Sequence, residues 1–104
     1  MFVTAQGSPL SRYWRALERR HIFGAEIAVR EMNYISPRDA LGLLALYASF
    51  DSPKFEKAAI RWLGRLALEA ADLSLADLQL AAAALAALRR RPESALTVLR
   101  DLSR

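Results

Sequence analysis

The chain has 104 residues, the length of one domain, and its 15 lysine and arginine residues outnumber 11 aspartate and glutamate residues to give a net charge of +4. It contains no cysteine, which excludes thiol catalysis, thiolate metal sites and disulfide bonds. The hydrophobic fraction of 54% is ample for one core without a metal or a disulfide.

Two further features of composition bear on location. The longest uncharged runs, Ala40–Phe50 and Leu78–Leu88, are about half of the ~20 residues that a membrane-spanning helix needs, and the first residues lack the pattern of a targeting segment. We therefore expect a cytoplasmic protein with no membrane partner. The abundance of arginine, alanine and leucine is typical of a GC-rich genome and indicates a bacterial source.

Capping residues punctuate the chain. Three Ser-Pro pairs place a hydroxyl before a proline at a first helical position: Ser8-Pro9, Ser36-Pro37 and Ser52-Pro53. Ser74 with Asp77 forms an acidic capping box, and Pro92 marks a last start. No stretch alternates with period 2, so no strand is predicted. These signals predict six helices, at about 9–21, 23–33, 37–50, 53–71, 75–90 and 92–103.

One boundary is open: Gly24 either ends the first helix or lies within one longer helix. We expect a frayed segment over 1–7, followed by a single all-α domain over 8–104. Pairing of adjacent helices predicts three antiparallel helical hairpins, near 9–33, 37–71 and 75–103. The hairpins are expected to form a compact bundle or a short solenoid-like array.

Apolar residues indicate which helix faces are buried. In the first helix they recur at coiled-coil-like spacing, as Leu10, Trp14, Leu17 and His21. The fourth helix repeats this design, with Phe55, Ala59, Trp62, Leu63, Leu66 and Ala70 toward the core. The helices at 37–50 and 75–90 are apolar nearly all round, so each should be central or should contact another subunit.

Two stretches resemble a known family. LAAAALAALRRRPESALTVLRDL is similar to the helix–turn–helix of tetratricopeptide-like repeats, in which small residues of the first helix receive an Ala-Leu-x-x-Leu pattern from the second. Ala83, Ala86, Ala95 and Leu99 fall near the small and large positions. LLALYASFDSPKFEKAAIRWL is also similar, although the Trp-x-x-Leu-Gly signature and the 34-residue period are absent. We interpret the resemblance as general helical-hairpin packing.

The chemistry-bearing residues have structural explanations. His21 is the single histidine, and a lone histidine on an apolar seam is typical of a packed or capping residue. The sequence contains no Glu-x-x-His motif, phosphate-cradling glycine loop or nucleophile elbow. We therefore expect no enzyme activity, no catalytic residue, no metal or cofactor, and no small-molecule substrate.

Basic side chains form two stripes at helical spacing. One comprises Arg12, Arg15 and Arg19, and the other comprises Lys54, Lys57, Arg61 and Arg65. Each stripe lies opposite an apolar seam, where an amphipathic helix places its solvated residues. The alternative interpretations are a surface for DNA, RNA or another anion, and a surface for an acidic protein.

The sequence thus favours a small non-enzymatic protein–protein interaction or adaptor domain that self-associates, with a homodimer as the simplest form. The leading contact candidates are Tyr47, Phe50, Leu99 and Leu102. The alternative is an accessory DNA- or RNA-binding protein that uses the basic stripes of the helices at 9–21 and 53–71. A stand-alone helical domain without a partner surface is a third interpretation.

Overall fold

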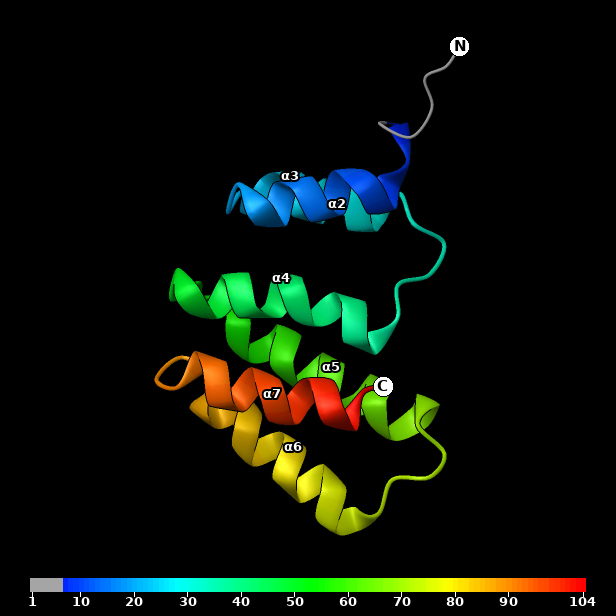
Figure 1. Ribbon diagram of the computed structural model, residues 1–104, viewed down its shortest axis with the longest axis vertical. Coiled ribbons are helices and arrows are strands. Elements are labelled where there is room, and N and C mark those ends of the chain that lie inside the picture. The colour runs from blue at the N-terminus through cyan, green and yellow to red at the C-terminus, as the bar shows by residue number, and fades with distance from the viewer. Residues whose placement is uncertain (1–6) are drawn as a thin grey trace. The chain divides into compact units, whose positions relative to one another are not determined.

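Six α-helices and no strand make up residues 7–104, the part of the chain that the computed structural model describes (Figure 1). The all-α prediction is confirmed, while the frayed segment expected over 1–7 lies, apart from Gly7, outside the described residues. The chain divides into two compact units, Met1–Ile35 and Ser36–Arg104, and each is described by itself. The single domain expected over 8–104 stays a prediction.

The first unit contains a helical hairpin. Helix α2 (Pro9–Glu18) packs against α3 (Ile22–Arg30), and the Ser8 hydroxyl accepts a hydrogen bond from the Ser11 N–H at 3.0 Å, as an N-cap does. Helix α2 ends at Glu18, three residues earlier than predicted. Arg20 adopts a left-handed conformation with φ of 57°, and the N–H groups of Arg20 and His21 bond to the carbonyls of Leu17 and Ala16. This is a Schellman motif without the usual glycine.

Gly24 therefore does not end the first helix. It lies in the first turn of α3, where an added Cβ would come within 2.6 Å of His21 Nδ1 and 3.4 Å of the Ala16 Cβ. The close approach of α3 also decides which face of α2 is buried. Tyr13 and Ala16 are buried, whereas Leu10 and Trp14 are 44% and 42% exposed. The predicted apolar seam of α2 was wrong, because α3 packs on the small Ala16 and the neighbouring Tyr13.

The second unit contains four helices. They are α4 (Pro37–Ser49), α5 (Phe55–Glu69), α6 (Leu75–Ala87) and α7 (Pro92–Leu102). Ser36 accepts a hydrogen bond from the Asp39 N–H at 3.0 Å, and Ser74 with Asp77 forms the predicted capping box. Helix α5 begins two residues later than predicted, because the Ser52 hydroxyl bonds the Lys54 N–H within the preceding turn.

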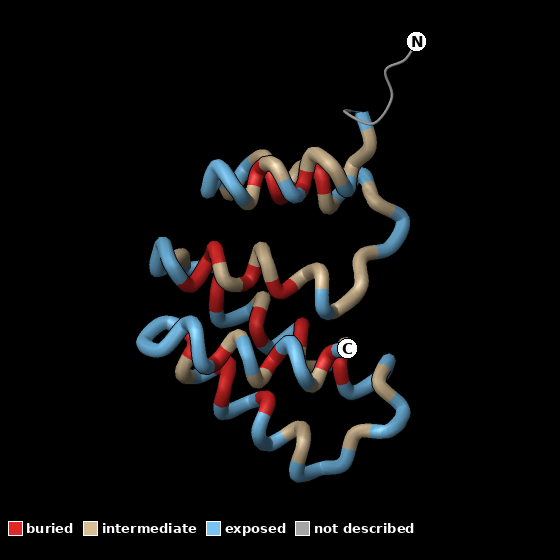
Figure 2. The backbone as a smooth tube through the Cα atoms, in the orientation of Figure 1, coloured by how far each residue is buried: buried red, intermediate tan, exposed pale blue. Residues whose placement is uncertain are grey.

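The four helices pack as two hairpins. Helix α4 contacts α5 and α6 contacts α7, as predicted, and the hairpins join through α4 against α7 and α5 against α6. The predicted core side of α5 is confirmed at four of its six residues, since Phe55, Ala59, Trp62 and Leu66 are buried, while Leu63 and Ala70 are half-buried. Buried residues follow the inner sides of the helices (Figure 2).

The helix at 75–90 was expected to be central or to contact another subunit. Helix α6 is not central: it lies at one side of the second unit, where it contacts only α5 and α7 among the described helices. Ala83 and Ala86 were expected to be the small residues against which α7 packs. Both are exposed, and the alanines that are buried are Ala81 and Ala84. The buried positions are displaced from the predicted ones by two residues, about 200° around the helix, so nearly the opposite side of α6 packs against its neighbours. This packing leaves a broad apolar side of α6 uncovered.

Candidate interaction surface

The uncovered side of α6, called here the α6 face, consists of seven exposed residues. They are Leu75, Ala76, Gln79, Leu80, Ala82, Ala83 and Ala86. At ~100° per residue they span an arc of about 160°. The α6 face carries no charge, since the only charged side chain between Leu75 and Leu88 is the capping Asp77.

The exposure of the large residues is pronounced. Leu75 is 76% exposed and Leu80 is 49% exposed. Single exposed leucines are ordinary on protein surfaces, but a contiguous uncharged patch is typical of an interaction site. The alanines between the leucines form a shallow surface that a second helix can approach closely.

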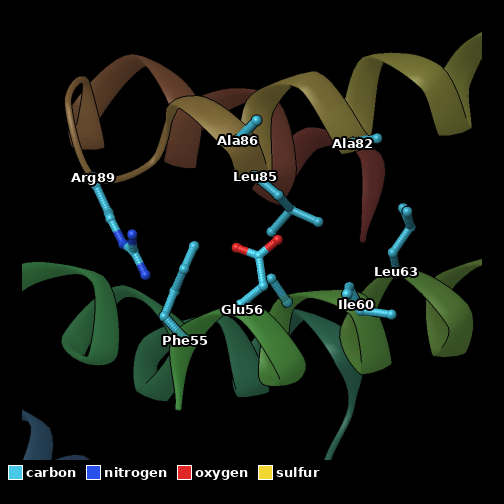
Figure 3. A pocket seen from close by; sticks show the side chains of 9 residues that line it. Phe55, Glu56, Ile60, Leu63, Ala82, Leu85, Ala86 and Arg89 are labelled. Atoms are coloured by element: carbon cyan, nitrogen blue, oxygen red, sulfur yellow. The ribbon is translucent and has the colours of Figure 1, made fainter. Parts of the chain in front are cut away.

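A groove of about 270 Å³ borders the α6 face, between α5 and α6 (Figure 3). Both helices contribute apolar walls: Ala59, Ile60 and Leu63 from α5, and Ala82, Leu85 and Ala86 from α6. Ile60 is 64% exposed. Ala82 and Ala86 belong to both the groove and the α6 face, so the two form one continuous surface.

Charged groups close one end of this groove. The Arg89 guanidinium lies 4.7 Å from the centre of the Phe55 ring, a cation–π contact, and its Nε is 3.5 Å from Asp51 Oδ1. The Glu56 carboxylate points across from α5 toward α6 (Figure 3). An apolar groove with two opposite charges at one end offers orientation as well as burial to a docked helix.

The structure corrects the exposure expected for two of the predicted contact residues. Tyr47 is 8% exposed and Leu99 is fully buried, because the leucine stripe of α7 faces α4 and α6. Phe50 is 50% exposed, and Leu102 is half-buried. Of the four predicted contact residues, only Phe50 therefore presents a large exposed side chain.

The basic stripe of α5 remains a solvated strip. Lys54, Lys57 and Arg61 are exposed, and Arg65 Nε donates to Glu69 Oε2 at 2.9 Å. Trp62, adjacent in sequence, is buried and donates through Nε1 to the Pro37 carbonyl at 2.7 Å. This tryptophan is thus engaged in packing and is unavailable for stacking on a nucleic-acid base.

The basic stripe of α2 lines a hollow of about 300 Å³ in the first unit. Arg12, Arg15 and Arg19 lie around it with His21 and Gly24. Arg12 forms an ion pair with Glu31 and also donates to the Gly7 carbonyl. The hydrogen bond from Arg12 lowers the pKa of the Glu31 carboxyl below its ordinary value. Part of the positive charge at the hollow is therefore already neutralised.

The basic stripe of α2 lies in the first unit and the basic stripe of α5 lies in the second, so each is described as a separate surface. His21 is the exposed N-cap residue of α3 and makes no side-chain capping bond. Across residues 7–104, no group of three or more His, Asp or Glu side chains is arranged to hold a metal ion. None of the helices in this range combines the length and apolarity that crossing a membrane requires.

No protein-family model, curated protein or solved structure matches this chain.

The α6 face was missed as a site, although its signal is present in the sequence. The helix at 75–90 was recognised as apolar all round, which admits either a central position or a subunit contact. The choice depends on how many neighbours the helix has, and that is a tertiary property.

Proposed function

We propose that this protein is a non-enzymatic protein–protein interaction domain that self-associates through the α6 face and the adjoining α5–α6 groove. One observation carries the proposal. Helix α6 is apolar nearly all round, yet within the part of the chain that the structure describes it packs against only two helices and leaves seven uncharged residues exposed.

Energetic considerations favour a second copy as the partner. Fully burying an exposed leucine contributes about 1.5–3 kcal/mol, so Leu75, Leu80 and Ile60, counted in both copies of a dimer, offer up to about 18 kcal/mol for association. Much of that gain offsets the lost freedom of the two chains, which leaves an affinity in the micromolar range, about −8 kcal/mol. Because the α6 face is uncharged, two copies that each carry +4 can meet there with little repulsion.

Substitution of Ala83 by glutamate tests this proposal. Ala83 is exposed, and glutamate is a good helix former, so the isolated chain should keep its helicity and lose at most a few tenths of a kcal/mol. In a dimer the carboxylate would be forced into an apolar contact. Light scattering at micromolar concentration should give twice the monomer mass of 11.6 kDa for the parent chain and the monomer mass for Ala83→Glu.

The matched control is Thr97→Glu, which places the same charge at an exposed position of α7. It should keep the dimer mass. A parent chain with a mass near 11.6 kDa over a wide concentration range would contradict self-association, and equal masses for the two variants would contradict the assignment to α6.

A second candidate function rests on the hollow lined by Arg12, Arg15 and Arg19: binding of a nucleic-acid backbone. If all three arginines neutralise phosphates, affinity for a fluorescent random-sequence DNA duplex should fall with a log–log salt slope of about −2.7. The variant Arg15→Glu with Arg19→Glu should abolish binding, whereas Arg104→Glu should weaken it only slightly. Absence of binding by the parent chain at 20 mM salt would eliminate this function.

A further inference from the structure

We infer that two copies of this chain associate with their α6 helices antiparallel across a two-fold axis that passes near residues 80 and 81. This inference rests on the proposed self-association and adds the geometry of the interface. It follows from how the α6 face and the charges at its two ends are distributed along one short helix.

The α6 face is nearly symmetric about the middle of the helix. Leu75 and Ala86 lie equally far from the point between residues 80 and 81, and Gln79 and Ala82 do so as well. All four lie within about 60° of one another around the helix axis. An antiparallel pair therefore places each Leu75 against the small Ala86 of the second copy, at both ends of the contact. A parallel pair would instead place leucine against leucine at one end and leave alanine against alanine at the other.

The single polar side chain of the α6 face is compatible with this axis. Gln79 lies one to two residues from the midpoint, so the two Gln79 side chains of an antiparallel pair are separated by only about 4–5 Å along the axis. A glutamine amide has both donor and acceptor groups. The two amides can thus hydrogen-bond to each other, which removes the penalty for burying them.

Charges at the ends of α6 distinguish antiparallel from parallel pairing. Asp72 precedes the helix, and Arg89, Arg90 and Arg91 follow it. Asp72 and Arg90 are exposed, and within residues 7–104 neither forms an ion pair. At the register that pairs Leu75 with Ala86, antiparallel pairing places Asp72 of each copy opposite Arg89 of the other, with Arg90 one residue, about 1.5 Å, further along. Parallel pairing would bring the arginines of both copies together.

Cysteine cross-linking tests the geometry, because the chain has no native cysteine to interfere. In the antiparallel pair, two copies of Leu75→Cys hold their thiols about 16 Å apart along the axis, beyond the reach of a disulfide. The same is true of two copies of Ala86→Cys. A mixture of the two variants should therefore form a disulfide-linked dimer under mild oxidation, while each variant alone should remain unlinked.

Efficient linkage of either single variant with itself would overturn the antiparallel geometry. So would a mixture that fails to link while light scattering still reports a dimer; in that case the proposed self-association stands and only its geometry fails. A monomer mass for the unmodified chain would contradict both the self-association and its antiparallel geometry.

Charge exchange provides an independent readout. Arg90→Asp and Asp72→Arg should each weaken dimerisation roughly tenfold, because each replaces two rim attractions with two repulsions. The chain that carries both substitutions should recover the parent affinity, since it restores opposite charges at each end. Tighter dimerisation of Arg90→Asp alone would indicate parallel helices, and failure of the double variant to recover would exclude the Asp72–Arg90 pairing.

Discussion

Replacing Trp62 with alanine is expected to lower the free energy of unfolding of the second unit by about 3–5 kcal/mol, which is a large part of the stability of a small domain. Trp62 is 4% exposed and is the largest buried side chain of α5. Its Nε1 donates to the Pro37 carbonyl at 2.7 Å, so it ties the middle of α5 to the first residue of α4. The substitution leaves a cavity and removes this bond.

Urea unfolding followed by circular dichroism measures the loss. Trp62→Phe keeps most of the ring volume but leaves the Pro37 carbonyl without its donor, so it should lose about 1–3 kcal/mol. Trp14→Phe is the matched control, because Trp14 is 42% exposed and should lose under 1 kcal/mol. A small loss for Trp62→Ala would mean that this tryptophan is not the anchor between α4 and α5.

Replacing Leu99 with alanine is expected to lower the free energy of unfolding by about 2–5 kcal/mol, without any direct effect on association. Leu99 is fully buried in α7, which packs against both α4 and α6. The cavity would lie where the two hairpins of the second unit meet. The loss should therefore appear as a single cooperative transition at lower urea concentration.

Leu102→Ala provides the comparison within the same leucine stripe. Leu102 is only half-buried at the end of α7, so its loss should be closer to 1 kcal/mol. Light scattering of folded Leu99→Ala should still report the dimer mass. A monomer mass under conditions where circular dichroism reports full helicity would make Leu99 a contact residue after all.

The helices were largely predictable because their start signals are local. A serine cap before proline or before an acidic third residue acts within one turn, so the starts at Pro9, Pro37 and Leu75 follow from adjacent residues. The ends were harder to predict. Arg20 and Asp51 terminate their helices in the left-handed conformation, and neither residue type is the glycine that normally marks such an end.

Burial was predictable only where the apolar stripe was unambiguous. The core side of α5 follows from its period, since charged residues occupy the opposite side. For α6 the hydrophobic period carries no information. Nearly every position is apolar, so the sequence does not distinguish which side of the helix faces the core. The packing of α5 and α7 selects the rotation, and with it the residues that remain exposed. The residues of the α6 face can therefore be identified only from the tertiary structure.

The same logic explains the misplaced contact residues. The sequence favours Tyr47 and Leu99 as contact residues because they are large apolar side chains on helices that carry more apolar residues than one core needs. Large apolar side chains gain most from burial, so such residues are the first to be taken into the core. Small residues such as Ala82 and Ala86 remain on the outside because leaving them exposed costs little.

The left-handed residues Arg20 and Asp51 have a practical consequence. A residue with a Cβ in this conformation is less stable than glycine by about 1 kcal/mol, and each of these two lies in the short turn of a different hairpin. Glycine at either position relieves that strain and changes neither a buried side chain nor the α6 face, and at position 51 it also removes the ion pair with Arg89. A glycine substitution in one of these turns is therefore expected to raise the free energy of unfolding. The variant can then accept a mildly destabilising substitution elsewhere and remain folded.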